Sequence, residues 1–199
     1  YRPPSYLVET VDLHIQLSPA QTKVCATIQF IANPDCSEKR SGLHLYGRQL
    51  ELLSIKLDGR ELTAGEYRVD SEGLTIPVVP EGFVLETLVE INPEGNTALE
   101  GLYRASEIFC TQCEAQGFRK ITFYPDRPDV MARFTTTLVG DLETTPVLLA
   151  NGNLIESGHL DDGRHYARFE DPFPKPSYLF AMVAGKLTAI DDSFVTMSG

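Results

Sequence analysis

Apolar and polar residues alternate along much of this chain. Every second position is apolar in residues 11–17, and the same two-residue period recurs in residues 83–91. This period is typical of a β-strand that buries one face. Further strands of this kind are expected at residues 24–31, 52–57, 74–79, 134–139, 147–151, 165–169 and 178–187.

Short turn sequences separate several of these predicted strands. Residues such as Gly, Asn, Asp and Pro suit tight turns. Four sequences are therefore expected to close hairpins: Ser18-Pro19-Ala20-Gln21, Asp58-Gly59, Asn151-Gly152 and Asp162-Gly163. No pattern indicates an amphipathic helix of about ten or more residues. The sequence predicts a mostly β fold, an antiparallel β-sandwich or open barrel of about ten short strands, in a single domain over residues 1–199.

Residues 96–133 break the alternation and are rich in polar and turn-forming residues. A loop of this length inside a compact domain is usually functional or disordered. Its aromatic residues argue against disorder, and we expect a long functional loop in which Arg119, Asp126 and Arg127 form ion pairs. The aromatic residues are Tyr103, Phe109, Phe118, Phe123 and Tyr124.

Charge and composition exclude some classes of partner. The chain has 28 acidic against 17 basic residues and a net charge of -11, so its field repels the phosphates of nucleic acids. No run approaches the roughly 18 consecutive apolar residues of a membrane span. Four cysteines are too few for a disulfide scaffold. We therefore expect a cytoplasmic protein with no nucleic-acid or membrane partner.

Most motifs that carry chemistry are missing or incomplete. Cys110 and Cys113 form a CxxC pair, which can provide half of a zinc site or a redox disulfide, but the sequence offers no matching second half. No phosphate-binding glycine loop occurs. The four histidines, His14, His44, His159 and His165, lack the spacing of a zinc protease. We expect the two cysteines to be ordinary thiols, and His14 and His44 to be solvated on the polar side of their strands.

Gln112 and Glu114 remain as candidate ligand-binding residues within the long polar segment. They are two residues apart, so their side chains point the same way if the backbone is extended. A Glu in a polar loop is more often a solvated charge, and the spacing leaves both interpretations open.

Several longer motifs resemble a known family. They are TALEGLY at residues 97–103, CTQCEAQGFR at residues 110–119, YPDRPDV at residues 124–130, DPFPKP at residues 171–176 and YLFAMVAG at residues 178–185. Together they resemble the N-terminal domain of the M1 family of zinc aminopeptidases, and the similarity extends over essentially the whole chain. The match is specific because the motifs are long and occur in the family's order.

The resemblance implies a saddle-shaped, mostly β N-terminal domain that packs on a downstream catalytic domain. In the family, His-Glu-x-x-His and a further Glu hold the zinc, and none of these motifs occurs in this sequence. The resemblance thus implies one domain of a longer enzyme that removes N-terminal amino acids from peptides. Catalytic residues and metal ligands are expected outside this chain, which by itself should be inactive and bind no zinc.

The resemblance also gives roles to the two candidate residues. It implies that Glu114 helps to bind the free α-ammonium of a peptide substrate and that Gln112 lines the pocket for the first side chain. A carboxylate forms a strong charge-assisted hydrogen bond to an ammonium group, and an amide both donates and accepts.

Two alternatives remain open on the sequence. The chain could be a stand-alone β-sandwich binding module without catalysis, or belong to a scaffold member of the family that has lost its zinc ligands. A domain built to pack on another should expose a contiguous apolar area, whereas an independent module should be polar outside its ligand site.

Overall fold

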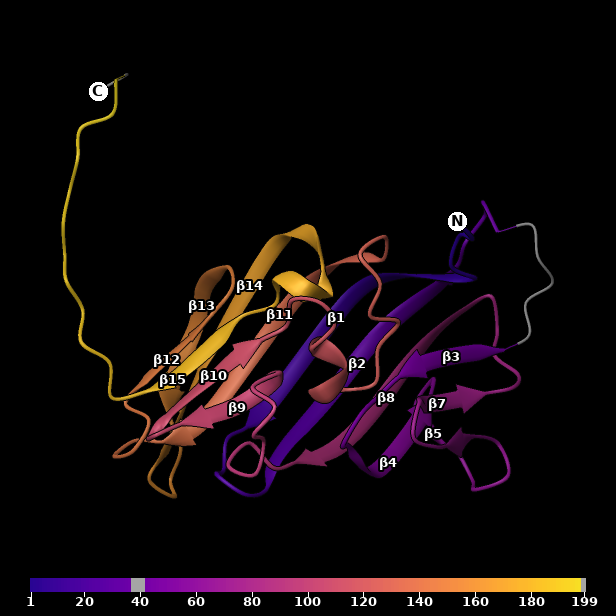
Figure 1. The fold of residues 1–199 in the computed structure, drawn as a ribbon, viewed down its shortest axis with the longest axis horizontal. Helices are drawn as coiled ribbons and strands as arrows, with labels where there is room; N and C mark the ends of the chain where they lie inside the picture. Colours follow the sequence, from indigo (N-terminus) through magenta and orange to yellow (C-terminus); the bar gives the residue numbers. More distant parts are fainter. Residues whose placement is uncertain (37–41, 198–199) are drawn as a thin grey trace.

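A long, strongly curved sheet of eight strands forms the body of the protein in the computed structural model, which describes residues 1–36 and 42–197 (Figure 1). Its strands are β1 (Tyr6–Gln16), β2 (Thr22–Ala32), β4 (Glu51–Leu57), β5 (Arg60–Glu61), β8 (Gly82–Ile91), β11 (Met131–Asp141), β13 (Asn153–His159) and β14 (Arg164–Pro176). They lie in the order β13-β14-β11-β1-β2-β8-β4-β5, so β13 and β5 form open edges and the sheet does not close into a barrel.

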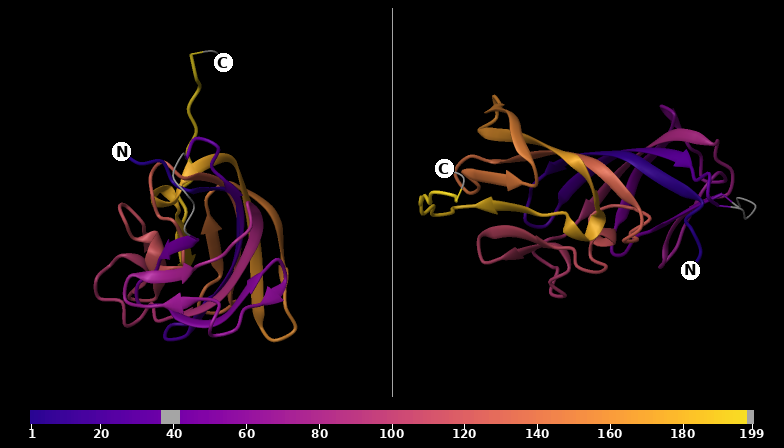
Figure 2. Two further views of the ribbon diagram at one scale, coloured as in Figure 1. Left: turned by 90° about the vertical axis from the view of Figure 1, so that its right-hand side faces the viewer. Right: turned by 90° about the horizontal axis from the view of Figure 1, so that it is seen from above.

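Two smaller sheets pack against the concave side of this sheet (Figures 1 and 2). The first has four strands in the order β12-β15-β10-β9, and the second has three in the order β3-β7-β6. Side chains from all three sheets join in one hydrophobic core. The strands are β12 (Val147–Ala150), β15 (Met182–Gly185), β10 (Ile108–Gln112), β9 (Gly101–Ala105), β3 (Leu43–Tyr46), β7 (Gly73–Ile76) and β6 (Arg68–Val69).

The predicted alternation is confirmed in the long strands. In β1 the side chains of Val11, Leu13 and Ile15 are buried in the core, whereas Asp12 and His14 point to the other face. Strand β8 shows the same alternation along its length. One face of each strand therefore builds the core and the other faces outward.

One strand pair departs from the antiparallel prediction. Strands β1 and β11 run parallel, from Thr10 opposite Arg133 to Gln16 opposite Val139, while the other pairs of the described strands are antiparallel. A hairpin forces neighbouring strands to run antiparallel, but a long connection leaves either direction open. The alternation of side chains reports burial and not strand direction, so the sequence could not reveal this pair.

Three of the four predicted hairpins are confirmed. The turns after β1, β4 and β13 join antiparallel partners. The prediction for Asn151-Gly152 was wrong, because β12 pairs with β15 and β13 pairs with β14. A turn sequence fixes a local reversal of the chain, whereas core packing selects the strands that pair; here the turn carries the chain from one sheet to another.

Two predicted strand boundaries also change. The strand expected at residues 178–187 is a short 3-10 helix, η2 (Ser177–Leu179), followed by β15. The strand expected at residues 74–79 ends at Ile76, since Pro77 has no N–H for the ladder. The helices of the described residues are three-residue 3-10 turns, and none of them has the length to cross a membrane.

Candidate functional site

Residues 96–133 are not the single long loop that the sequence predicted. They contain the hairpin of β9 and β10, the 3-10 helix η1 (Phe118–Lys120) and the beginning of β11. Strands of five residues are too short for a clear two-residue period. The segment is ordered around Phe118, as its aromatic residues indicated: the Phe118 ring packs edge-on against Tyr124, Phe134 and Phe180, with centroids 5.0 to 5.9 Å apart.

A turn at residues 113–117, here called the Glu114 turn, connects β10 to η1. Cys113 at its start is buried and only 2% exposed, while Glu114, Ala115 and Gln116 are exposed. The backbone N–H of Gly117 donates to the Cys113 carbonyl at 3.0 Å. The peptide bond between Ala115 and Gln116 is cis. Both ends of the turn are therefore anchored in the core and only its tip reaches solvent.

Two glycines allow the Glu114 turn to lie directly on the backbone of the β9–β10 hairpin. A Cβ atom on Gly117 would overlap the carbonyl oxygen of Gln112. Gly101, opposite Gln112 in the hairpin, has a φ of +73°, and a Cβ there would lie 2.6 Å from the Cβ of Lys120. Sequence reasoning did not identify these glycines, because close backbone approach is a tertiary property.

Gln112 and Glu114 lie where the hairpin ends and the turn begins. Gln112 is the last residue of β10, and both side chains are exposed on either side of the buried Cys113. The strand ends at Gln112 and Glu114 lies in the turn, so the extended backbone that would point both side chains the same way does not continue through this pair. Within the described part of the chain, no hydrogen bond or ion pair uses either side chain. Both are free to contact a ligand, although this chain alone does not shield them from water.

Of the two CxxC cysteines, Cys110 and Cys113, the buried Cys113 has the character of a structural thiol. Both are free, and burial raises the pKa of Cys113 to about 12. A thiol with a raised pKa is seldom a thiolate, which is the form that binds metals and attacks electrophiles. Over residues 1–36 and 42–197, no three His, Cys, Asp or Glu side chains gather as a metal site would require. The residues present therefore do not fit a zinc ion.

The expected ion pairs hold the segment that follows the turn. Arg119 Nε donates to Asp126 Oδ2 at 2.7 Å, and both side chains are buried. Arg127 pairs with Asp129 instead, at 2.6 Å, and this contact holds the pKa of Asp129 at about 2. These charges satisfy one another and stabilise the segment without contacting the tip of the Glu114 turn.

Two clusters of polar side chains, one around His14 and one around Arg60, lie away from the Glu114 turn. On the outward face of the large sheet, burial lowers the pKa of the half-buried His14, while Arg168 pairs with Asp12 at 2.9 Å and Tyr166 donates to Glu156 at 2.6 Å. The charged and phenolic groups of this area are paired with one another, so they indicate a structural role.

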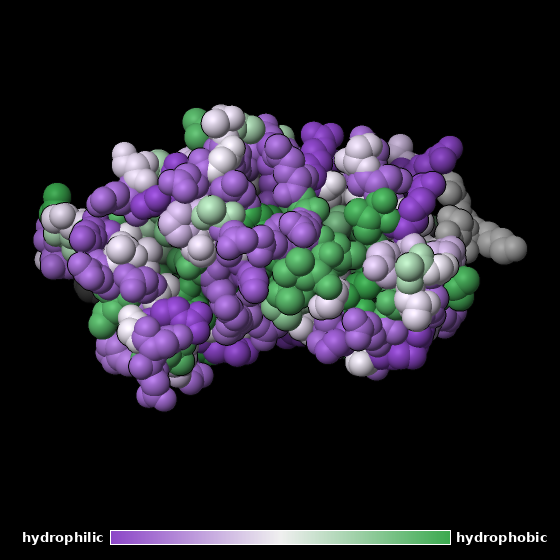
Figure 3. Space-filling view, turned by 90° about the horizontal axis from the view of Figure 1, so that it is seen from below, coloured by the Kyte–Doolittle hydropathy of each residue, from purple (hydrophilic) through white to green (hydrophobic). Residues whose placement is uncertain are grey.

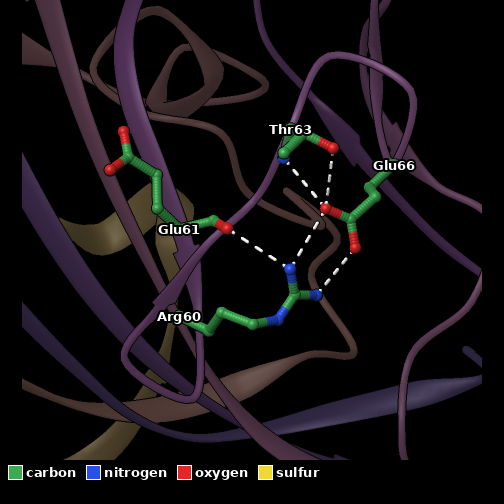
Figure 4. Close-up of polar contacts among 4 residues, drawn as sticks. All are labelled: Arg60, Glu61, Thr63 and Glu66. Atoms are coloured by element: carbon green, nitrogen blue, oxygen red, sulfur yellow. Dashed lines mark hydrogen bonds and ion pairs between the residues drawn. The ribbon is translucent and has the colours of Figure 1, made fainter.

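Around β5, the side chain of Arg60 binds Glu66 at 2.7 and 3.1 Å and the carbonyl oxygen of Glu61, and Glu66 also accepts hydrogen bonds from Thr63 (Figure 4). These bonds lower the pKa of Glu66 to about 2. The Glu66 carboxylate is thus held by both Arg60 and Thr63, and the cluster stabilises the turn after β5.

Comparison with known proteins places the chain in a family. The profile of the Peptidase M1 N-terminal domain matches residues 3–179. Over 199 residues the chain is 52% identical to aminopeptidase N of Caulobacter vibrioides and 44% identical to aminopeptidase N of Escherichia coli. It covers 23% and 22% of the length of these relatives, so it spans less than a quarter of each.

Solved structures agree with this assignment. A crystal structure of Legionella pneumophila aminopeptidase A in complex with aspartic acid is 35% identical, with a TM-score of 0.90 over 94% of this chain and 22% of that one. An M1 zinc metallopeptidase from Deinococcus radiodurans, at 17% identity and a TM-score of 0.77 over 91% of this chain and 42% of that one, shares the fold. The motifs, the three-sheet fold and these relatives agree, and the chain belongs to the M1 peptidase family as its N-terminal domain.

Proposed function

We propose that this chain is the N-terminal domain of a longer zinc-dependent aminopeptidase and that it binds the first residue of the peptide substrate. Glu114 binds the α-ammonium group, and Gln112 lines the pocket for the first side chain. The observation that carries this proposal is the presence of two exposed, unpartnered polar side chains, one at the end of β10 and one on the adjoining turn, whose ends are fixed in the core.

The chemistry of the two residues suits these roles. An α-amino group has a reference pKa of about 7.7 to 8.0 and is largely protonated at neutral pH. A carboxylate that meets this charge forms a hydrogen bond stronger than a neutral one. The Gln112 amide donates and accepts without adding charge. Fixing the first residue at both points also orients the next peptide bond, and such orientation lowers the barrier to its cleavage.

A second part of the same polypeptide completes the site in this proposal. The described residues do not fit zinc, so the metal and the catalytic groups are held outside them. The exposure of Glu114 and Gln112 in this chain leaves room for a covering surface. Such a surface excludes water and strengthens the attraction between carboxylate and ammonium.

The surface supports a packing partner over a stand-alone module. Figure 3 shows an apolar area on one face of the molecule, bordered by polar side chains. Exposed large apolar side chains include Phe173 at 75% and Leu99 at 54%. Exposed apolar area of this kind is what the catalytic portion would cover. We also propose a cytoplasmic location, since the four cysteines are free.

Glu114→Ala in the full-length enzyme tests the function. We expect kcat/KM for peptides with a free N-terminus to fall by about tenfold or more, which corresponds to about 1.4 kcal/mol of transition-state binding. Glu107→Ala is the matched control, because Glu107 is an exposed carboxylate at the other end of the same hairpin. An unchanged kcat/KM in Glu114→Ala, with Glu107→Ala equally active, removes Glu114 from substrate binding.

A further inference from the structure

Three buried polar side chains meet at η1, two of them from residues 119–126 and the third from η2. Arg119, Asp126 and Ser177 are 6%, 2% and 1% exposed. Asp126 Oδ2 accepts from Arg119 Nε at 2.7 Å and from the Arg119 backbone N–H at 3.3 Å, and Asp126 Oδ1 accepts from Ser177 Oγ at 2.8 Å. The carboxylate thus has partners on both oxygens, as a buried charge requires.

The geometry of this group is tightly specified. The guanidinium of Arg119 lies over the ring of Tyr46, 4.3 Å from its centroid, and Arg119 Nη2 donates to the Asp126 carbonyl at 3.4 Å. Asp126 has a φ of +46°, a conformation that costs a residue other than glycine about 1 kcal/mol or more. The planar fork of an arginine fixes direction as well as charge. The group therefore holds one arrangement of the segments it joins.

Those segments connect to both ends of the Glu114 turn. Arg119 lies in η1, which begins directly after the turn, and Ser177 lies in η2, which leads into β15. Strand β15 pairs with β10, the strand that ends at Gln112. Thr111 strengthens this pairing, because its hydroxyl accepts from the Met182 N–H at 2.9 Å and donates to the Met182 carbonyl at 3.3 Å. Through Arg119, Asp126 is bonded to η1, which follows Glu114. Through Ser177, it is bonded to η2, which leads into β15, the partner strand of β10, and β10 precedes Glu114.

We propose that Asp126, held by Arg119 and Ser177, is a positioning residue that sets the Glu114 turn for binding of the substrate α-ammonium. This inference rests on the proposed function and adds buried residues to the exposed Gln112 and Glu114. Apolar side chains of the same volume would stabilise the core at least as well as a buried ion pair. A directional pair instead holds the turn in a single orientation, so that the Glu114 carboxylate stays where it contacts the substrate α-ammonium.

The test measures KM and kcat separately in the full-length enzyme. Ser177→Ala removes one hydrogen bond to Asp126 and retains the Arg119–Asp126 pair. We expect KM for a free-amine aminoacyl substrate to rise by about threefold with kcat changed by less than about twofold, because α-ammonium binding is lost equally from the ground and transition states. Arg119→Lys, which keeps the charge and loses the fork, should act in the same direction.

Thr145→Val is the matched control. It removes another buried hydroxyl, which donates to the Asp141 carbonyl at 2.7 Å. Thr145 precedes Val147, which pairs with Gly185, so it lies at the opposite end of the four-stranded sheet from Gln112. We expect KM to stay unchanged in this variant, even if the melting temperature falls as much as in Ser177→Ala.

A double mutant separates positioning from general destabilisation. In a Glu114→Ala background, Ser177→Ala should raise KM no further, because the turn no longer presents a carboxylate to position. An equal rise in both backgrounds, or an unchanged KM in Ser177→Ala alone, overturns the positioning role and leaves the proposed function intact. If Glu114→Ala itself has no effect, both proposals fall together.

Discussion

At the scale of single residues, the interior contains a tyrosine whose hydroxyl is buried without a hydrogen-bond partner among the described residues. Tyr124 is fully buried, and its hydroxyl has no hydrogen-bond partner within residues 1–36 and 42–197. Burial raises the pKa of this phenol far above its ordinary value, with a smaller contribution from the nearby Asp126 carboxylate. Burying a hydroxyl without a hydrogen-bond partner lowers the stability of the folded protein, whereas burying the aromatic ring does not carry this cost.

Tyr124→Phe should therefore stabilise the protein. The change keeps the ring contacts with Phe118 and Phe134 and removes the unpaired hydroxyl, so the free energy of unfolding should rise by about 1 kcal/mol. Urea unfolding at neutral pH measures it. Tyr166→Phe, whose hydroxyl is bonded to Glu156 at the surface, should change stability by less than about 0.5 kcal/mol. A loss of stability in Tyr124→Phe would show that the hydroxyl has a partner such as a buried water.

At the scale of elements, the close contact of the Glu114 turn with the β9–β10 hairpin gives a sharp requirement for glycine. Gly117 has an ordinary φ of −95°, so the restriction at this position comes from space and not from backbone conformation. The atoms that a new Cβ would meet are backbone atoms, which move only if the turn or the hairpin moves. The carbonyl of Gln112 is the nearest of them.

Gly117→Ala should destabilise the protein by about 2 kcal/mol, since overpacking a fixed backbone contact strains both segments. The same variant in the full-length enzyme should lower kcat/KM, because the shift reaches Glu114. Gly65→Ala is the control: no atom lies within 4 Å of its Cβ position, and no positive φ restricts it. Chemical unfolding of both variants measures the difference, and equal stabilities would mean that the turn adapts without cost.

At the scale of the whole molecule, the domain has a core of its own, and in the proposed function another part of the polypeptide completes its site. Its three sheets share one hydrophobic core, whereas the candidate binding residues project into solvent without a facing wall. We expect residues 1–199 expressed alone to cleave no aminoacyl substrate and to retain less than about 0.1 zinc per chain after dialysis, because a protein zinc site needs at least three ligands. Metal analysis and an activity assay test this directly. Stoichiometric zinc in the dialysed chain would contradict the proposed division of the site.

Particular elements show how far the sequence alone reaches. The two-residue period of β1, β2 and β8 determined that they are strands with one buried face, because alternation along a strand is a local property of the backbone. Long motifs likewise pointed to the M1 family and to Gln112 and Glu114. The Glu114→Ala measurement tests the role that we propose for this pair.

Only the tertiary structure decided which strands pair, in which direction, and what fixes the candidate residues. The parallel pair of β1 and β11, the pairing of β12 with β15 in place of β13, and the hydrogen bond from Ser177 to Asp126 all join residues far apart in the chain. Such contacts depend on how the sheets share a core. No local pattern records them, because each side chain's neighbours are set only when the whole chain has packed.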